Sequence, residues 1–75
     1  MKNNEGDRPQ DFVGKRICTL RKQLKLTQAT LASSSGMEES ALQRIEAGRT
    51  NPTIKTLYKV SKALNVHIKD LFEDL

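Results

Sequence analysis

The side chains that can do acid–base or nucleophilic chemistry are few in this sequence, and their spacing does not suit it. Glu38 and Glu39 are adjacent carboxylates, but neighbouring helical residues diverge by ~100° and do not bracket a scissile bond. The serines at 33–35 and the single His67 have no partner at a catalytic spacing. The sequence has no glycine-rich phosphate loop and no H-E-x-x-H pattern. We therefore predict a binding protein and not an enzyme.

Cys18 is the only cysteine in the sequence, so the chain cannot form an internal disulfide. No cysteine and histidine cluster has metal-ligand spacing, and we expect neither a metal nor a cofactor. Without a second cysteine or a flanking cation, Cys18 is expected to be a half-buried, unreactive thiol. No apolar run approaches the ~18 residues of a membrane span, and the polar N-terminus lacks a signal-peptide pattern. These features favour a cytoplasmic protein with no membrane partner.

The charge distribution suggests binding chemistry of another kind. Residues 15–69 carry eleven Lys and Arg against three Glu, a net charge of +8, within a chain whose total is +4. Both ends are acidic, at −1 for residues 1–14 and −3 for residues 70–75. A basic middle suits a polyanion such as a nucleic acid.

The elements that must position these charges centre on residues 26–48. Thr27 can cap a helix that begins at Gln28, Gly36 supplies a sharp turn, and Gly48 closes a second helix over about 38–47. In this second helix the apolar side chains lie at helical spacings, which predicts that they face a core. They are Met37, Leu42 and Ile45.

The flanking sequence predicts further helices. The first runs from about Pro9 or Gln10 to Leu24, with an apolar stripe of Val13, Ile17, Leu20 and Leu24. Another, capped by Thr53, runs to about Leu64 with Asn65 as its left-handed stop, and a short last helix covers about 68–73. The helix capped by Thr53 has an apolar set of Ile54, Leu57, Val60, Ala63 and Leu64. Residues 1–8 read as a disordered polar tail, and residues 9–75 as one domain.

The sequence resembles the Cro/C1 (XRE-type, phage-repressor-like) helix-turn-helix family of DNA-binding domains over roughly residues 12–72. The residues that carry the resemblance are Leu26-Thr27-Gln28, Leu31-Ala32, Gly36-Met37, Leu42, Ile45-Glu46 and Gly48, with Gly14, Ile17, Leu20 and Arg21 upstream and Asn51-Pro52-Thr53, Leu57, Ala63-Leu64 and Leu71 downstream. The resemblance implies a compact, all-α, five-helix lambda-repressor-like domain with a central helix-turn-helix. It also implies a repressor-like transcriptional regulator that binds specific sites in double-stranded DNA. Lys25 departs from the pattern, because the family often has glycine there.

The resemblance also implies roles for individual residues, with the second helix of the motif in the major groove. The base-contact candidates are Glu38, Glu39, Ser40, Gln43 and Arg44. The backbone-contact candidates are Thr27, Gln28, Arg49, Asn51 and Lys55. Arg21 is expected to pair with Glu46, either as a purely structural pair or while Arg21 also reaches a phosphate. The family often has Ser or Thr where this chain has Glu38, so the two glutamates either reject wrong sites or mark an unusual operator.

The final expectations concern partners. The subtype resembles stand-alone regulators such as restriction–modification controller proteins, which implies a homodimer on a pseudo-palindromic operator, without an attached ligand-sensing domain or a small-molecule ligand. The dimer-interface candidates are Val66, Ile68, Phe72 and Leu75, with a place in the intramolecular core as the alternative for each. The competing hypothesis is a helical protein-interaction module or antitoxin-like partner with weak or no specific DNA binding. Gln28, Arg44 and Arg49 argue against it, and the two glutamates argue mildly for it.

Overall fold

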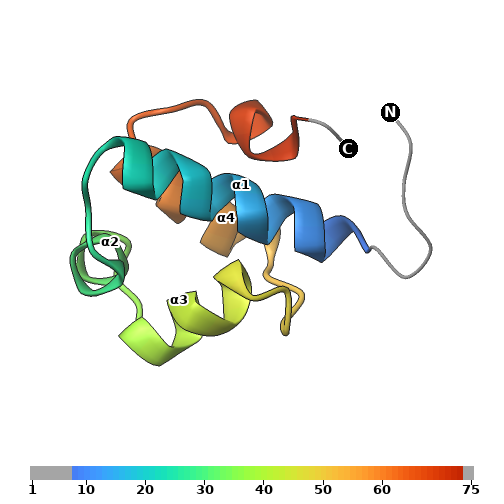
Figure 1. Ribbon diagram of the computed structural model, residues 1–75, viewed down its shortest axis with the longest axis horizontal. Helices are drawn as coiled ribbons and strands as arrows, with labels where there is room; N and C mark the ends of the chain where they lie inside the picture. Colours follow the sequence, from blue (N-terminus) through green and yellow to red (C-terminus); the bar gives the residue numbers. More distant parts are fainter. Residues whose placement is uncertain (1–7, 74–75) are drawn as a thin grey trace.

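The computed structural model describes residues 8–73, and within that range it contains four α-helices, one 3-10 helix and no strand. The elements are α1 (Pro9–Gln23), α2 (Gln28–Ser34), α3 (Glu39–Glu46), α4 (Ile54–Ala63) and the 3-10 helix η1 (Ile68–Phe72). Figure 1 shows α1 running the length of the domain, with α3 on one side and η1 on the other. The helices α2 and α3 pack on each other, and α4 packs on α2 and η1.

The all-helical prediction is confirmed, but the count of five α-helices is not. The last segment is a 3-10 helix of five residues that begins after His67. The Asp70 carboxylate accepts a hydrogen bond from the His67 amide at 3.0 Å, and the Asp70 amide donates to the His67 carbonyl at 2.9 Å. This i to i+3 pattern suits a segment too short to propagate an α-helix. The buried Leu71 then anchors η1 to the core.

The predicted helix starts are present. The Thr27 hydroxyl accepts from the Thr30 amide at 3.0 Å, and the Thr53 hydroxyl accepts from the Thr56 amide at 3.1 Å. Each bond satisfies one of the amide groups that a helix start leaves without an intrahelical partner. The predicted residues 1–8 tail lies outside the described residues except for Arg8, which stands at the N-cap of α1.

All four α-helices end in the same way, with a residue in the left-handed region followed by a backbone bond that reaches back five positions. The left-handed residues and their φ angles are Lys25 (59°), Gly36 (71°), Gly48 (74°) and Asn65 (59°). The closing bonds run from Leu26 to Arg21 (3.1 Å), Met37 to Ala32 (2.9 Å), Arg49 to Arg44 (2.9 Å) and Val66 to Ser61 (3.0 Å). Lys25 therefore makes a turn that glycine commonly makes at the end of a helix, although its side chain disfavours this conformation.

The core is formed by apolar side chains from every helix. Its members are Val13, Ile17, Leu20, Leu31, Ala32, Leu42, Ile45, Leu57, Val60, Leu64 and Leu71. Two members of the predicted apolar sets lie outside this core, since Leu24 is 50% exposed and Ile54 is 67% exposed. Leu24 is the C-cap of α1 and Ile54 is the first residue of α4, so both lie where the helix leaves the packed region.

Candidate nucleic-acid interface

The helix α3 separates a buried apolar face from an exposed polar one. Leu42 and Ile45 are buried, and Met37, just before the helix, is half-buried against the core. The five base-contact candidates, Glu38, Glu39, Ser40, Gln43 and Arg44, are all exposed. This helix thus presents a continuous polar surface on a framework that its apolar face holds in place.

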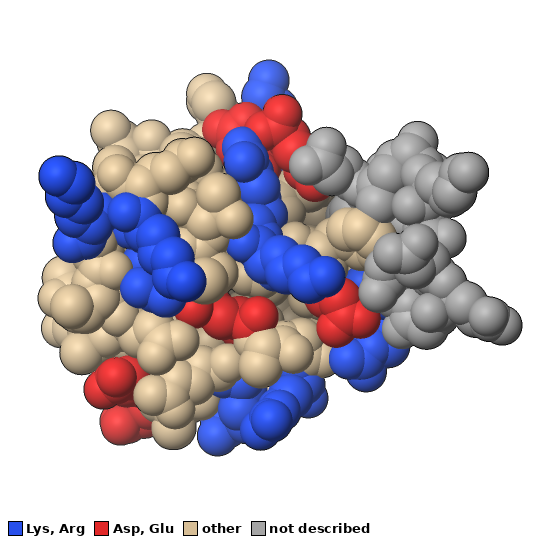
Figure 2. Space-filling model, viewed as in Figure 1, with Lys and Arg blue, Asp and Glu red and all other residues tan. Residues whose placement is uncertain are grey.

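Charge is unevenly distributed along α3. Glu39 lies in its first turn and Arg44 in its last. Figure 2 shows acidic side chains at the lower left, over the start of α3, and Lys and Arg side chains along the lower edge, below its later part. An anionic ligand on this face is therefore attracted mainly to the C-terminal half of α3, while the two glutamates stand at the positive end of the helix dipole.

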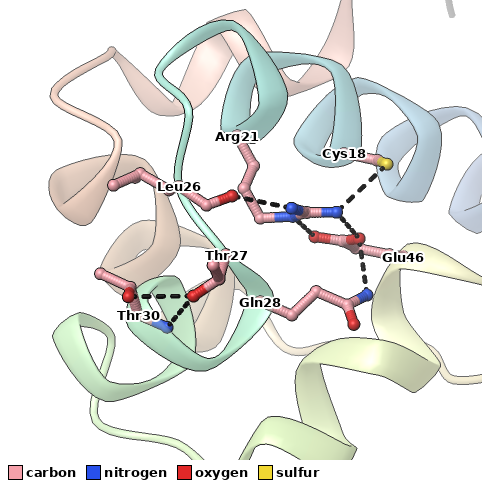
Figure 3. Close-up of polar contacts among 7 residues, drawn as sticks. All are labelled: Cys18, Arg21, Leu26, Thr27, Gln28, Thr30 and Glu46. Atoms are coloured by element: carbon pink, nitrogen blue, oxygen red, sulfur yellow. Dashed lines mark hydrogen bonds and ion pairs between the residues drawn. The ribbon is translucent and has the colours of Figure 1, made fainter.

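A buried ion pair joins α3 to α1 (Figure 3). Arg21 Nε donates to Glu46 Oε2 at 2.7 Å and Nη2 donates to Oε1 at 3.1 Å. Arg21 Nη1 also donates to the Leu26 carbonyl at 2.8 Å, so the same guanidinium binds the turn between α1 and α2. The side chains of Arg21 and Glu46 are only 10% and 6% exposed.

This environment changes the pKa of both partners. Burial alone raises the pKa of Glu46, but the hydrogen bonds from Arg21 and Gln28 outweigh it and hold the pKa below its ordinary value. The hydrogen bonds to Glu46 raise the pKa of Arg21. Since the guanidinium is buried and its nitrogens are occupied, the geometry favours the structural role of Arg21 over a contact with a phosphate.

Two residues around this pair make contacts that the sequence did not predict. Arg21 Nη2 lies 3.6 Å from the Cys18 sulfur, so the half-buried thiol does have a flanking cation. Gln28, a backbone-contact candidate, is half-buried and donates from Nε2 to Glu46 Oε1 at 3.0 Å (Figure 3). Its side-chain amide therefore belongs to the network that holds α3, and its exposed neighbour Thr27 uses its hydroxyl on Thr30.

The remaining backbone-contact candidates, Arg49, Asn51 and Lys55, are all exposed, beyond the end of α3. A hollow of about 300 Å³ lies between α3 and α4, with Arg44, Asn51 and Lys59 among its lining residues. Sequence reasoning missed Lys59. Its helical spacing of four residues from Lys55 was the available signal.

The dimer-interface candidates fall into two groups. Val66, Ile68 and Phe72 are half-buried and pack partly against the core, so each also serves the fold. Leu75 lies outside the described residues. Ile54, not among the candidates, is highly exposed and lines an apolar hollow of about 150 Å³ together with Phe72.

Sequence reasoning also missed Arg8. Its guanidinium donates to the Gly48 carbonyl at 2.8 Å and pairs with Asp11 at 3.0 Å. The Arg-Pro-x-Asp spacing was a signal for the local pair, but nothing local pointed to Gly48.

In the described range, we find no helix with the length and apolar character needed to cross a membrane. Nor do residues 8–73 bring together a set of side chains that could ligate a metal.

Comparison with known proteins places this geometry in context. A family model described as helix-turn-helix (HTH_3) matches residues 19–71. An uncharacterised HTH-type transcriptional regulator, y4dJ of Sinorhizobium fredii, is 41% identical over 55 residues, covering 73% of this chain and 71% of that protein. The immunity repressor protein of Bacillus phage phi105 is 43% identical over 56 residues, covering 75% of this chain but 39% of the repressor.

Solved structures agree with the sequence comparison. The restriction–modification controller protein C.AhdI from Aeromonas hydrophila superposes with a TM-score of 0.83 at 32% identity, covering 84% of this chain and 96% of that one. A chain of the SinR protein/SinI protein complex superposes with a TM-score of 0.77 at 36% identity, covering 83% of this chain and 61% of that one.

Proposed function

Since the chain belongs to the helix-turn-helix (HTH_3, Cro/C1-type) family of DNA-binding transcriptional regulators, which are not enzymes, we propose that it reads a specific DNA site with the exposed face of α3 in the major groove. The observation that carries this proposal is the division of α3 between buried Leu42 and Ile45 and the exposed polar residues opposite them. We further propose that the protein acts in the cytoplasm, where it would meet DNA.

Three exposed side chains of α3 suit particular base edges. Arg44 can donate two hydrogen bonds to guanine O6 and N7, and Gln43 can bind adenine in the same bidentate way. Glu39 can accept from the amino group of cytosine. Glu38 and Glu39 repel phosphates, so we propose that they select against sites where they find no donor.

Cationic and polar side chains beyond α3 would supply the contacts that do not depend on sequence. We assign Arg49, Asn51 and Lys55 to the DNA backbone, and the hollow that Lys59 lines beside Arg44 supports adding Lys59 to them. At the start of α2, we assign Thr27 and Gln28 to a phosphate through the main chain, because the first amides of a helix favour an anion.

We also propose that the active species is a two-fold homodimer on a pseudo-palindromic operator, with recognition helices about one DNA turn, ~34 Å, apart. The half-buried side chains of Val66, Ile68 and Phe72 remain the candidates, together with Leu75 outside the described residues. The exposed Ile54 beside Phe72 extends this apolar surface and supports the assignment.

One observation keeps a second function in view. One structural neighbour is a chain of the SinR protein/SinI protein complex, and this chain has two glutamates where its recognition helix begins. A module that binds a protein partner through α3 would tolerate these glutamates better than a DNA-binding one, because it would not face a row of phosphates.

Selection from a random-sequence duplex pool in the presence of heparin separates the two functions. We expect the wild-type protein to enrich a pseudo-palindrome, because base contacts survive a polyanionic competitor that removes nonspecific binding. The matched control is Arg44→Ala, which keeps the fold because Arg44 is exposed. A folded wild-type protein that enriches no sequence over the starting pool would favour the protein-interaction module.

A further inference from the structure

Arg8, the N-cap residue of α1, forms hydrogen bonds that link the start of α1 to the end of α3. Arg8 Nη2 donates to the Gly48 carbonyl at 2.8 Å and to Asp11 Oδ1 at 3.0 Å, while Arg8 Nε donates to Asp11 Oδ2 at 3.3 Å. The Arg8 amide donates to the same carboxylate at 2.9 Å. The Arg8 guanidinium holds the pKa of Asp11 below its ordinary value, so the carboxylate stays ionised in this contact. One guanidinium thus joins the start of α1 to a residue 40 positions later.

Gly48 cannot be replaced by a residue with a side chain without disturbing the packing against α1. It is buried, its φ is 74°, and a Cβ built on it would collide with the Asp11 carboxylate. One turn further along α1, a Cβ on Gly14 would collide with the Ile45 carbonyl and lie 2.8 Å from the Glu46 carbonyl. The end of α3 therefore packs directly on the backbone of α1. The Arg8 side chain adds a hydrogen bond to the Gly48 carbonyl at this contact.

The loop that follows is weakly held. The Arg49 amide donates to the Arg44 carbonyl at 2.9 Å, which closes α3. Thr50 and Asn51 make no hydrogen bond to any other residue between 8 and 73. The hydrogen bond from the Arg8 side chain to the Gly48 carbonyl therefore attaches the start of this loop, just after α3, to α1.

We propose that Arg8 is a positioning residue for DNA binding: through the Gly48 carbonyl it orders the loop that carries Arg49 to the DNA backbone. The inference rests on the proposed phosphate contact of Arg49. In this proposal Arg8 acts through the Gly48 carbonyl and not through a DNA contact of its own, because Nε and Nη2 bind Asp11 and Gly48. A segment outside the helix-turn-helix thereby sets the affinity of the motif.

Amide hydrogen exchange in the DNA-free protein tests this attachment itself. In Arg8→Ala we expect the Arg49 amide to exchange roughly three- to tenfold faster, because a charge-assisted hydrogen bond at the loop is lost. The internal control is the Met37 amide, which makes the equivalent bond at the end of α2 at 2.9 Å and does not contact Arg8. Unchanged exchange at Arg49, or equal acceleration at Arg49 and Met37, would overturn the proposal.

DNA binding tests the consequence with a double-mutant cycle of Arg8→Ala and Arg49→Ala on the selected site. We expect Arg8→Ala to weaken binding about three- to tenfold alone and to have no further effect once Arg49 is removed, because its effect passes through that residue. Lys15→Ala, at an exposed position on α1, controls for the lost charge. Additive losses, or a loss no larger than that of Lys15→Ala, would overturn the positioning role.

Failure of the underlying function is distinguishable from failure of this inference. If Arg49→Ala binds like the wild type, the phosphate contact of Arg49 is wrong and the positioning role falls with it. The exchange measurement then still decides whether Arg8 orders the loop, since it requires no DNA.

Discussion

Arg21 of α1 and Glu46 of α3 meet through two hydrogen bonds, at 2.7 and 3.1 Å, although 25 positions separate them in the sequence. Gln28 binds the same carboxylate and Arg21 also binds the Leu26 carbonyl, so α1, α2 and α3 converge on one ion pair. This buried charge pair is therefore one of the contacts that fix the angle at which α3 is presented.

We expect this pair to show strong energetic coupling. Arg21→Met or Glu46→Leu alone should lower the free energy of unfolding by about 3–5 kcal/mol, because each strands a buried charge. The double variant should lose much less than the sum of the singles. Denaturant unfolding measures the cycle, and the more exposed pair of Arg16 and Glu73 is the control, with an expected coupling of about 0–1 kcal/mol. Additive losses at Arg21 and Glu46 would contradict the pair.

The same carboxylate predicts how stability depends on pH. The pKa of Glu46 lies below its ordinary value of 4.5 in the folded state, so the unfolded state takes up a proton first as the pH falls. The free energy of unfolding should therefore decrease from about pH 5 downward and continue to decrease until the folded pKa is passed. Asp11, whose pKa is lowered by the hydrogen bond from Arg8, contributes in the same direction below its ordinary 3.8.

Thermal unfolding across this acid range provides the measurement. Glu46→Gln should flatten the dependence on pH, whereas Glu39→Gln should leave it unchanged, because Glu39 is exposed and forms no ion pair with another described residue. A Glu46→Gln variant with the full acid dependence would show that other carboxylates cause it.

Lys25 offers a site where the protein can be stabilised. Its φ of 59° disfavours any side chain, so Lys25→Gly should raise the free energy of unfolding by roughly 0.5–1 kcal/mol. The matched control is Lys22→Gly, which removes the same charge from the last turn of α1 and should lower stability by roughly 1 kcal/mol. Melting temperatures of the two variants should move in opposite directions, and a shared direction would be inconsistent with strain at Lys25.

These helix ends also mark what could be predicted from sequence. Thr27, Thr53, Gly36, Gly48 and Asn65 act through bonds to residues within about five positions, so their types alone indicate where helices begin and end. The exposure of Leu24 and Ile54 could not be predicted in this way. Periodicity assigns a residue to a face of a helix, but it does not show where a neighbouring element stops covering that face.

Some features of the candidate site could likewise be predicted from the sequence, and others could not. The exposed face of α3 follows from local spacing, and the pairing of Arg21 with Glu46 was implied by the family resemblance. The bond from Arg8 to the Gly48 carbonyl spans 40 positions and uses a backbone acceptor, which every residue possesses. The residue type at position 48 therefore does not indicate that its carbonyl binds Arg8. This contact follows only from the packing of α1 on α3.

Replacing Arg44 and replacing Arg49, five positions apart, should affect DNA binding in different ways. If Arg44 makes a bidentate base contact, Arg44→Ala should cost about 1–3 kcal/mol at the preferred base and relax discrimination there. If Arg49 neutralises a phosphate, Arg49→Ala should weaken all sequences alike and make the salt slope shallower by about one. Binding of both variants to single-base variants of the selected site, across a salt series, checks this. Uniform weakening by Arg44→Ala, or a changed base preference in Arg49→Ala, would reverse the assignment.

The dimer prediction is tested by charge at the apolar surface near η1. Phe72→Glu should weaken dimerisation, but Phe72 is half-buried, so the substitution also risks unfolding the chain. Ile54→Glu probes the neighbouring surface without that risk, because this side chain is 67% exposed. Sedimentation should show a shift from dimer to monomer for Ile54→Glu with an unchanged helical spectrum. A wild-type monomer that binds a single half-site with full affinity would reject the dimer.

Three arginines at or on α1 bind three later parts of the chain: Arg8 the Gly48 carbonyl, Arg16 the Asp70 carbonyl and Arg21 the Glu46 carboxylate. Opening α1 would release all three bonds at once, and two of them, from Arg8 and Arg21, hold the end of α3. An excised peptide of residues 27–47 would lack these anchors and would not keep the angle between its helices. Engineering a new DNA specificity should therefore exchange side chains on the exposed face of α3 within this scaffold, and not transplant the motif to another protein.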